Sequence, residues 1–396
     1  MPDLPILIAG GGIGGLAAAL GLARKGFRSI VLEQAPELGE IGAGIQIGPN
    51  AFHAFDYLGV GDAARAKAVY IDHLVLMDAV RDERVAAIPL DEPFRQRFKN
   101  PYAVVHRADL HMVLLDACRA SDLISLRTSC AVERYDQGAS SVTVTLGNGE
   151  QVSGSALIGA DGLRSKVRTQ VVGDAQPRVS GHTTFRSVIP TERMPEDLRW
   201  NAATLWAGPK CHIVHYPLKG GKVFNLVVTC HNDAAEAVAG VPVTKDEVRK
   251  GFEHIADRPK RIIDHGENWK LWVLCDRDPT ANWVDGRVVL LGDAAHPMLQ
   301  YLAQGACMAL EDAVNLSHRL AEAEGDFATA FPAYNRDRFA RTGRVQTSSR
   351  LMGEYVYHPD GGQAALRNAI LGCSTPEQHY DRVSWLYGVT GLGAAV

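Results

Sequence analysis

The sequence predicts an α/β protein: a Rossmann-like domain that is interrupted by a β-rich insertion and followed by a C-terminal helical segment. Three observations support this fold. A short apolar strand, a glycine-rich turn and a helix-like stretch open the chain in the run LPILIAGGGIGGLAAALGLARKG. Long β-rich runs dominate from about residue 180 to 230. Residues 325 to 396 are mostly helical in pattern, with Gly and Pro breaks at HPDGG.

These changes of pattern divide the chain into three parts. The Rossmann-like domain is expected to be discontinuous, built from residues 1–75, 100–178 and 270–350. Between its pieces, residues 76–99 and 179–269 would form a β-rich domain that walls a small-molecule site. Residues 351–396 would form a helical segment that could serve for dimerisation.

Composition excludes several classes of protein. Of 396 residues, 46% are hydrophobic and 22% are charged, as in an ordinary soluble globular protein. A net charge of -4 gives no electrostatic footprint for a nucleic-acid partner. The seven cysteines form no CxxC pair, so neither a disulfide framework nor a metal site is expected. The apolar N-terminus lacks the basic start of a signal peptide, and we therefore expect a cytoplasmic protein with no transmembrane segment.

The first motif is Gly10-x-Gly12-x-x-Gly15, between a strand and a helix, with Glu33 at the end of the next strand. The glycines permit the tight turn, the close approach of a pyrophosphate and the packing of helix on strand. The helix N-terminus attracts phosphates, and Glu33 can accept a hydrogen bond from a ribose hydroxyl. A dinucleotide is expected here, although the motif does not distinguish NAD from FAD.

The second motif is IGADGLRSKVR, residues 158–168, in which a strand ends at Asp161 and a helix follows. Arg164, Lys166 and Arg168 stand at alternate positions, and arginines beside a dinucleotide contact its phosphates. The alternative is that Asp161 caps a helix with a solvated basic face.

The third motif is LLGDAAHPMLQYLAQGACMALEDAVNL, residues 290–316. Asp293 ends a strand at the sheet edge where ligands bind in such folds, and could hydrogen-bond a sugar-alcohol chain. A helix should begin at about Gly305, and its free N–H groups would stabilise an anion such as a reduced flavin ring. The alternative for Asp293 is a plain helix cap.

In this order and spacing, the three motifs resemble the class A flavoprotein aromatic hydroxylases, which are single-component FAD monooxygenases. The resemblance covers about residues 5 to 350. It implies tightly bound FAD, with NADH and O₂ as co-substrates. In that family, the residue at Glu33 binds the FAD ribose, Arg107 in HRADL contacts the flavin linker, and Asp293 holds the ribityl chain.

The resemblance also implies a wider set of cofactor-binding residues. The segment with Asp161 and Arg164 serves both FAD and the nicotinamide cofactor, and GAGIQIGPNA, residues 42–51, matches the loop beside the flavin ring. No metal ligand is implied. The full set implied is Gly10, Gly12, Gly15, Glu33, Gln46, Arg107, Asp161, Arg164, Asp293, Pro297, Gly305 and Ala306.

One departure from the family pattern concerns the substrate. Many relatives have Pro three residues after the position of Pro297, whereas this chain has Gln300. With that residue, HPMLQYLAQGA looks most like the 3-hydroxybenzoate 6-hydroxylases. The resemblance implies hydroxylation of 3-hydroxybenzoate para to its phenol, giving 2,5-dihydroxybenzoate (gentisate), through a flavin C4a-hydroperoxide and a substrate phenolate.

Ionising a phenol of pKa near 10 calls for a general base, and the run CHIVHYPL supplies candidates. In a strand, His212, Val214 and Tyr216 share one face, with His212 and Tyr216 roughly 13 Å apart at the backbone. We expect His212 to be the base or proton relay, and Tyr216 and Gln300 to bind the phenol or carboxylate. A register shift of one residue would substitute His215.

Other histidines and other activities stay open at this stage. His106 could also reach the pocket, whereas His296 is expected to be structural. Salicylate 1-hydroxylase, which forms catechol, is the nearest rival, followed by other hydroxybenzoate or hydroxynicotinate hydroxylases. A flavoprotein oxidase or reductase and a non-catalytic nucleotide-binding protein are the alternatives outside the class. The partners expected are a small aromatic acid and a second copy of the chain; NADH against NADPH is left open.

Overall fold

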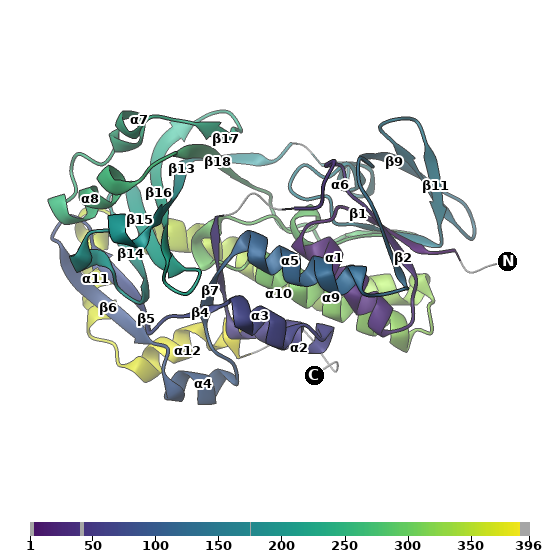
Figure 1. The fold of residues 1–396 in the computed structure, drawn as a ribbon, viewed down its shortest axis with the longest axis horizontal. Coiled ribbons are helices and arrows are strands. Elements are labelled where there is room, and N and C mark those ends of the chain that lie inside the picture. Colours follow the sequence, from purple (N-terminus) through teal and green to yellow (C-terminus); the bar gives the residue numbers. More distant parts are fainter. Residues whose placement is uncertain (1–3, 40–42, 175, 389–396) are drawn as a thin grey trace.

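The computed structural model describes residues 4–39, 43–174 and 176–388 of the chain. Two large sheets lie at opposite ends of an elongated molecule, and long helices run between them (Figure 1). The N-terminal strand lies at one end, with the glycine turn facing the middle. The functional site therefore has to be sought where the two halves meet.

The first half is built on a six-stranded sheet of order β19-β20-β12-β1-β2-β8. Its first strand, β1, pairs in parallel with β2 on one side and β12 on the other, and only the β19–β20 pair is antiparallel. The central strands β1, β12 and β20 are short, fully buried apolar runs, each ending at or just before a glycine. The strands are β1 (Ile6–Ala9), β2 (Ser29–Leu32), β8 (Ile124–Arg127), β12 (Ala156–Gly159), β19 (Val284–Asp285) and β20 (Val288–Leu290).

Helix α1 (Ile13–Arg24) lies against the long helix α9 (Gly305–Glu322). The two backbones approach closely at Gly21, where a Cβ atom would stand 2.8 Å from Ser317 Oγ. Helix α5 (Arg107–Arg119) packs on the other side of α1. The predicted Rossmann-like domain is thus confirmed, and α9 begins at Gly305 as the sequence indicated.

Helix α10 (Phe327–Met352) runs the length of α9 and is tied to it by buried charges. Arg338 donates to Asp312 Oδ1 at 2.6 Å and to Glu311 Oε2 at 2.7 Å, and all three side chains are fully buried. Arg341 adds a second bond to Glu311 Oε2, at 2.7 Å. Since a buried charge is costly unless it is paired, this network fixes the position of α9.

The second half is an eight-stranded mixed sheet of order β17-β18-β13-β16-β15-β14-β5-β6. Two helices, α7 (Lys245–Arg249) and α8 (Asp257–His265), lie at its outer end (Figure 1). The residues 76–99 and 179–269 proposed for the β-rich domain fall on this sheet and its helices. The strands are β5 (His73–Asp78), β6 (Glu83–Pro89), β13 (Arg178–Pro190), β14 (Ala202–Gly208), β15 (Cys211–Leu218), β16 (Val223–Ala234), β17 (Ala239–Pro242) and β18 (Lys270–Asp276).

The remaining strands of the described residues form two smaller sheets. The chain between residues 132 and 154 forms an antiparallel sheet of β9 (Val132–Gln137), β10 (Val142–Leu146) and β11 (Gln151–Gly154). The other small sheet joins β3 (Gly44–Ile47), β4 (Val69–Tyr70) and β7 (Ala103–His106).

Two helices follow β3, namely α2 (Pro49–Leu58) and α3 (Gly61–Lys67). Gly59 ends α2 because it adopts a left-handed conformation, with φ of 76°.

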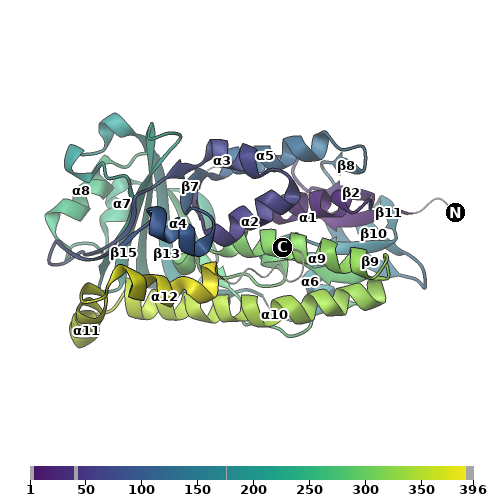
Figure 2. The same cartoon turned by 90° about the horizontal axis from the view of Figure 1, so that it is seen from below.

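The last part of the chain returns to the eight-stranded sheet. A π-helical turn at Gly353–Tyr357 ends α10, and α11 (Gly361–Gly372) and α12 (Pro376–Tyr387) follow (Figure 2). Tyr380 donates to the carbonyl of Pro89 at 3.0 Å, which fastens α12 to β6. Residues 389–396 of the expected helical segment lie outside the described residues. Within the described residues, none of the helices is both long and apolar enough to cross a membrane.

Candidate active site

The carboxyl ends of four neighbouring parallel strands meet at one edge of the six-stranded sheet. β1 ends before Gly10, β2 before Glu33, β12 before Ala160 and β20 before the turn that holds Asp293. Ligands of open α/β sheets bind outside this edge. Three motifs that lie far apart in the sequence are therefore assembled in one place.

The glycine turn is shaped for a close approach. Gly10 has φ of 103°, and a Cβ atom there would lie 2.4 Å from the carbonyl oxygen of Ala160. A Cβ on Gly15 would lie 2.0 Å from the carbonyl oxygen of Gly10. Gly12 is the N-cap of α1 and brings no side chain to its first turn, so the N–H groups of that turn are open to a phosphate.

Glu33 is oriented by the same turn. One carboxylate oxygen accepts from the backbone N–H of Gly11 at 2.7 Å, and the other accepts from that of Ala35 at 2.8 Å. The side chain is half-buried beside the turn, as the ribose-binding prediction requires. That role stays a prediction.

The second helix start faces the same space. The N-cap of α9, Gln304, makes no side-chain bond to the first turn, and Gly305 and Ala306 line the cavity there. In the part of the chain that the structure describes, the Asp293 carboxylate caps no helix, so the alternative of a plain cap is not what the structure has.

Asp293 is exposed toward the cavity, which it lines. The surrounding protein desolvates its carboxyl group, and this raises the pKa by more than nearby His296 and Arg107 lower it. The carboxylate therefore gains from any hydroxyl group that donates to it from within the cavity.

Arg168 couples the second motif to the third. Its guanidinium is buried and donates to the backbone carbonyls of Ala294 and Ala295 at 2.9 and 2.6 Å, and to Asp174 at 2.7 Å. It therefore holds the turn that presents Asp293. The alternative that Arg168 lies on a solvated basic face is wrong, because its side chain is buried against this turn.

Asp161 and Arg164 have different surroundings. The Asp161 carboxylate accepts from Ser165 Oγ at 2.5 Å and from the N–H of Lys166 at 2.8 Å, so it binds the first turn of α6 (Lys166–Val171), whose N-cap is Ser165. This is close to the capping alternative, although its neighbour Gly162 does line the cavity. Arg164 is exposed on the loop before α6. Their cofactor roles stay predictions.

The residues around His296 support the turn from behind. His296 Nε2 lies 2.5 Å from Asp312 Oδ2, and both side chains are fully buried. The carbonyl of Pro297 accepts from Gln346 Nε2 at 3.1 Å. His296 is therefore structural, as expected, and Pro297 is a buried part of the turn, where its cofactor role stays a prediction.

The segment expected to lie beside the flavin forms β3 and the start of α2, and its residue 42 lies outside the described residues. Gln46 accepts from Tyr102 Oη at 2.7 Å and lines the cavity, as does Arg107. Gly44 packs on the eight-stranded sheet, since a Cβ there would stand 2.5 Å from the Tyr216 ring. The N–H of Gly44 also donates to Asn225 Oδ1 at 2.8 Å, which joins the two halves of the molecule.

One cavity of about 340 Å³ connects the cofactor edge to the eight-stranded sheet. His212, Val214 and Tyr216 on β15 line it, together with Gln300. Period-2 alternation thus correctly grouped these three β15 side chains on one face. His212 and Tyr216 are buried, with 1% and 2% of their surface exposed.

The other histidine candidates lie elsewhere. His215 points to the opposite face of the sheet, where its ring lies against Trp200 and Phe224. His106 lies near Asp109, with 3.8 Å between Nδ1 and Oδ1, and is not among the described residues that line the cavity. This geometry therefore supports neither His215, the register alternative, nor His106 as the base.

Sequence reasoning missed Arg186 on β13. Its Nη2 donates to Gln300 Oε1 at 2.9 Å, and its buried Nε has no partner among the described residues. It lines the same cavity as His212. A buried cation with an unused donor suits a carboxylate ligand.

Tyr357 and His358, from the turn after α10, were also missed. Tyr357 lines the cavity, and His358 Nε2 lies 2.7 Å from His212 Nδ1. No local pattern marks either residue, because the contact joins positions 146 residues apart.

Burial sets the protonation of the site. It lowers the pKa of His212 well below its usual value, with His358 and His182 adding to the effect, so the ring is neutral and can accept a proton. Burial also raises the pKa of Tyr216, against a smaller opposing effect of Arg186. The phenol of Tyr216 is thus a hydrogen-bond donor rather than an anion.

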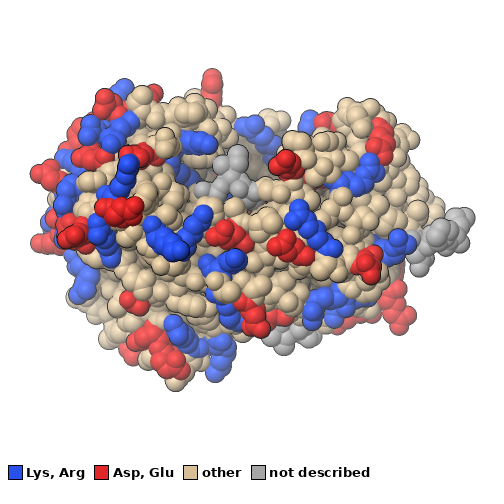
Figure 3. Space-filling model, viewed as in Figure 1, with Lys and Arg blue, Asp and Glu red and all other residues tan. Residues whose placement is uncertain are grey.

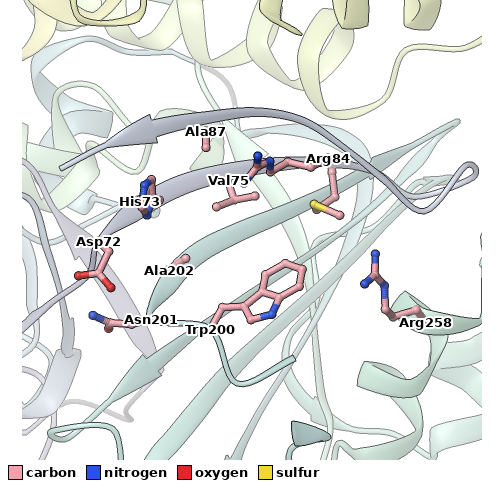
Figure 4. Close-up of a pocket in the computed structure, with 10 residues that line it drawn as sticks. Asp72, His73, Val75, Arg84, Ala87, Trp200, Asn201, Ala202 and Arg258 are labelled. Carbon is pink, nitrogen blue, oxygen red and sulfur yellow. The ribbon is translucent and has the colours of Figure 1, made fainter. Parts of the chain in front are cut away.

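A second hollow of about 430 Å³ lies on the outer face of the sheet (Figure 4). Its lining includes His73, Trp200 and Arg258. Ala202, which also lines it, lies on the same face of β14 as Thr204, the cross-strand partner of His215. It is therefore separated from the catalytic cavity by the sheet.

The distribution of charged side chains does not indicate a binding face for a polyanion such as a nucleic acid. On the face drawn in Figure 3, Lys and Arg are interspersed with Asp and Glu, with no basic stripe. Among the described residues, no group of three or more His, Cys, Asp or Glu side chains could hold a metal ion.

The residues of the cofactor edge fit FAD. Two uncapped helix starts open on one cavity, at α1 and at α9, and each suits an anionic part of a long cofactor. The carboxylates of Glu33 and Asp293 lie beside these two starts and can accept from sugar hydroxyls.

Comparison with known proteins agrees with this geometry. The FAD binding domain family matches residues 3–349. The chain belongs to this family. As a member of the FAD binding domain family, the protein is a flavoprotein of the class A hydroxylase kind, as its motifs indicated.

Two relatives within the family align over nearly the whole chain. The 3-hydroxybenzoate 6-hydroxylase 1 of Aquipseudomonas alcaligenes is 59% identical over 97% of both chains. The 3-hydroxybenzoate 6-hydroxylase of Polaromonas naphthalenivorans is 52% identical over 98% of this chain and 96% of its own. A solved structure of Klebsiella pneumoniae HpxO complexed with FAD and uric acid superposes with a TM-score of 0.86 at 25% identity, covering 97% of both chains.

Proposed function

We propose that the protein hydroxylates 3-hydroxybenzoate para to its phenol, using FAD, NADH and O₂, and releases 2,5-dihydroxybenzoate. The observation that carries the proposal is one arrangement: His212, Arg186 and Gln300 surround a cavity that opens on Asp293 and the start of α9. The proposal is also supported by the named activity of the relatives that match the whole chain.

FAD would be held along the carboxyl edge of the six-stranded sheet. Its pyrophosphate would lie at the start of α1, one ribose at Glu33, and its ribityl chain at Asp293. When bound and reduced by NADH, FAD activates O₂ and supplies the oxygen atom that enters the ring. The start of α9 would stabilise negative charge there through its open N–H groups.

The carboxylate of the substrate would pair with Arg186, whose Nε is free among the described residues. Gln300 holds the guanidinium of Arg186 in place and can also donate to the substrate through Nε2. With the carboxylate fixed, the phenol would lie toward His212 and Tyr216 on β15.

His212 would draw the phenol proton, and Tyr216 would donate to the resulting oxyanion. A phenolate directs electron density to its ortho and para carbons, and the para carbon of 3-hydroxybenzoate is position 6. Apolar walls, including Val214, Val227 and Leu299, keep water from the reacting carbon.

The decisive test is turnover with two substrates. NADH oxidation by the purified yellow protein would be followed with 3-hydroxybenzoate and with salicylate, and the products identified by chromatography. Gentisate from 3-hydroxybenzoate supports the proposal, whereas catechol from salicylate alone overturns it. In the second case the role of Gln300 also fails, and Gln300→Pro would be expected to change nothing.

We further propose a cytoplasmic homodimer that joins through the C-terminal helices. Leu366 and Ile370 stand one turn apart on α11 and are 62% and 51% exposed, and Leu351 and Tyr355 nearby are 49% and 47% exposed. Sedimentation of the wild type and of Leu366→Glu would test this: a dimer that becomes a monomer supports it, and a wild-type monomer contradicts it.

The division into a discontinuous cofactor domain, a β-rich substrate domain and a C-terminal segment is proposed with the boundaries given above. The cofactor preference for NADH is part of the same proposal. Parallel assays with NADH and NADPH test it directly.

A further inference from the structure

Behind His212, away from any motif, lies a group of four histidines. His212 Nδ1 and His358 Nε2 are 2.7 Å apart, and their rings stack with centroids 4.9 Å apart. The centroid of His182 lies 5.1 Å from that of His358, and His231 lies 4.4 Å from His182. Four imidazoles thus follow one another from the cavity outward.

The group passes from a buried end to an exposed end. His212 is 1% exposed, His358 and His182 are half-buried, and the side chain of His231 is 37% exposed. At the outer end, Asp233 Oδ1 lies 3.3 Å from His231 Nε2.

Three other groups border the series. Tyr301 shares a hydrogen bond with His182 Nδ1 and packs edge-on to His212, and Tyr357 also packs edge-on to His212. Arg178 acts electrostatically on His182 and is paired with Asp276 at 2.9 Å.

His212 cannot pass a proton directly to bulk water, because it is buried between the cavity and His358. Its Nδ1 is engaged by His358, which leaves Nε2 as the atom able to accept from the substrate. A base that has accepted a proton must lose it again before the next turnover. Within the described residues, the hydrogen-bond partner of its Nδ1 is another imidazole.

We propose that His358 is the second member of a two-histidine relay, which carries the phenol proton of the substrate from His212 to solvent beside His182 and His231. This inference rests on the proposed function. His358 is a positioning and relay residue, since it acts through His212.

The proton count of the relay is balanced. The phenol O–H bond breaks and its proton bonds to His212 Nε2, while the proton on His212 Nδ1 passes to His358 Nε2. His358, now cationic, loses the proton of its other nitrogen to water. Both rings end neutral in the opposite tautomer, and the reverse tautomer shift resets them before the next substrate.

The surroundings keep both outer rings neutral between turnovers. Burial lowers the pKa of His358 to about 3, with His182 and His231 adding to the effect, and burial likewise lowers the pKa of His182 to about 4. Neither ring keeps a proton at neutral pH, so the charge moves on to solvent.

The test compares two variants of the FAD-bound, full-length protein. His358→Gln keeps an amide that can bond to His212 but cannot relay a proton, whereas His358→Ala leaves space for a small molecule. The matched control is His318→Gln on the far part of α9, where His318 Nε2 lies 3.2 Å from Glu322 Oε1.

The measurement is stopped-flow proton release, read with a pH indicator dye as 3-hydroxybenzoate binds, together with kcat and KM. We expect both His358 variants to release the proton at least ~10-fold more slowly. Their kcat should fall, whereas their KM should change little. Added imidazole should restore the rate of His358→Ala but not of His358→Gln. The control should match the wild type.

Any of three results would overturn the relay. The first is proton release by His358→Gln within about twofold of the wild-type rate, and the second is failure of imidazole to rescue the alanine variant. The third is a defect confined to KM, which would indicate a merely structural contact. If the wild type binds 3-hydroxybenzoate but releases no proton, the relay is overturned and the proposed function is not. If the wild type does not bind 3-hydroxybenzoate at all, the proposed function fails with it.

Discussion

Arg186 and Gln300 meet across the substrate cavity, with Nη2 donating to Oε1 at 2.9 Å. The arginine comes from β13 and the glutamine from the turn after β20, so the bond joins the two halves of the molecule. Gln300 also lies 3.3 Å, through Nε2, from Thr229 Oγ1 on β16. The residue that departs from the family pattern is thus part of a polar wall, rather than a free side chain.

The first prediction follows from this pair. Arg186→Met should raise KM for 3-hydroxybenzoate by at least ~10-fold, since a charge-assisted bond is worth about 1.5–3 kcal/mol. The neutral analogue 3-hydroxybenzamide should be affected much less. Steady-state kinetics with both compounds measures the difference. The control is Arg193→Met, an exposed arginine paired with Glu267. Equal losses for acid and amide would contradict carboxylate binding by Arg186.

The second prediction concerns the base. His212→Gln should lower kcat by about 10²-fold or more, because general-base catalysis typically contributes that much. The residual rate should rise with pH, because a larger fraction of the substrate phenol is already ionised in solution. The pH profile of kcat measures this, with His215→Gln on the opposite face as control. A larger loss in the control than in His212→Gln would show that the wrong histidine was assigned.

The third prediction concerns the cofactor. Asp293→Ala should weaken FAD retention at least ~10-fold, since the carboxylate would no longer accept from the ribityl chain. The ratio of flavin to protein absorbance after gel filtration and the fluorescence of released FAD measure it. Asp136→Ala, at an exposed pair with Arg134, is the control. Full flavin content in Asp293→Ala would remove this residue from the cofactor site.

The fourth prediction concerns acid stability. Burial alone would raise the pKa of Asp312, but His296 and Arg338 outweigh it and hold the pKa at about 2. The usual value is about 3.9, so this carboxylate stabilises the fold above pH ~4 and loses that contribution as pH falls toward 2. Urea unfolding at pH 6, 4 and 3 should show a falling free energy of unfolding. Asp312→Asn should be less stable at pH 6 and show a shallower fall. Parallel curves for the two proteins would contradict the assignment.

Much of the cofactor edge could be predicted because each piece has a local signature. Gly10, Glu33 and Asp293 each follow a short apolar strand, and parallel strands bring such ends together. The alternation of β15 placed His212, Val214 and Tyr216 on one face, although it did not indicate which face lies inward.

The substrate wall was harder, because its parts have no common signature. Arg186 lies in a β-rich run in which nothing distinguishes the inward face. His358 lies after a π-helical turn, and its contact with His212 depends on how α10 lies across the molecule. Arg168 was expected to contact phosphates or to lie on a solvated face, because the sequence does not show that it donates to the carbonyls of Ala294 and Ala295.

Oxygen insertion at position 6 of the substrate ring can be tested by one labelling experiment. The purified protein, with FAD and NADH, would turn over 3-hydroxybenzoate under ¹⁸O₂, and the product would be analysed by mass spectrometry and chromatography. We expect 2,5-dihydroxybenzoate that carries one ¹⁸O atom, formed in step with NADH oxidation. NADH oxidation with hydrogen peroxide and unchanged 3-hydroxybenzoate, or a product hydroxylated at another carbon, would contradict it.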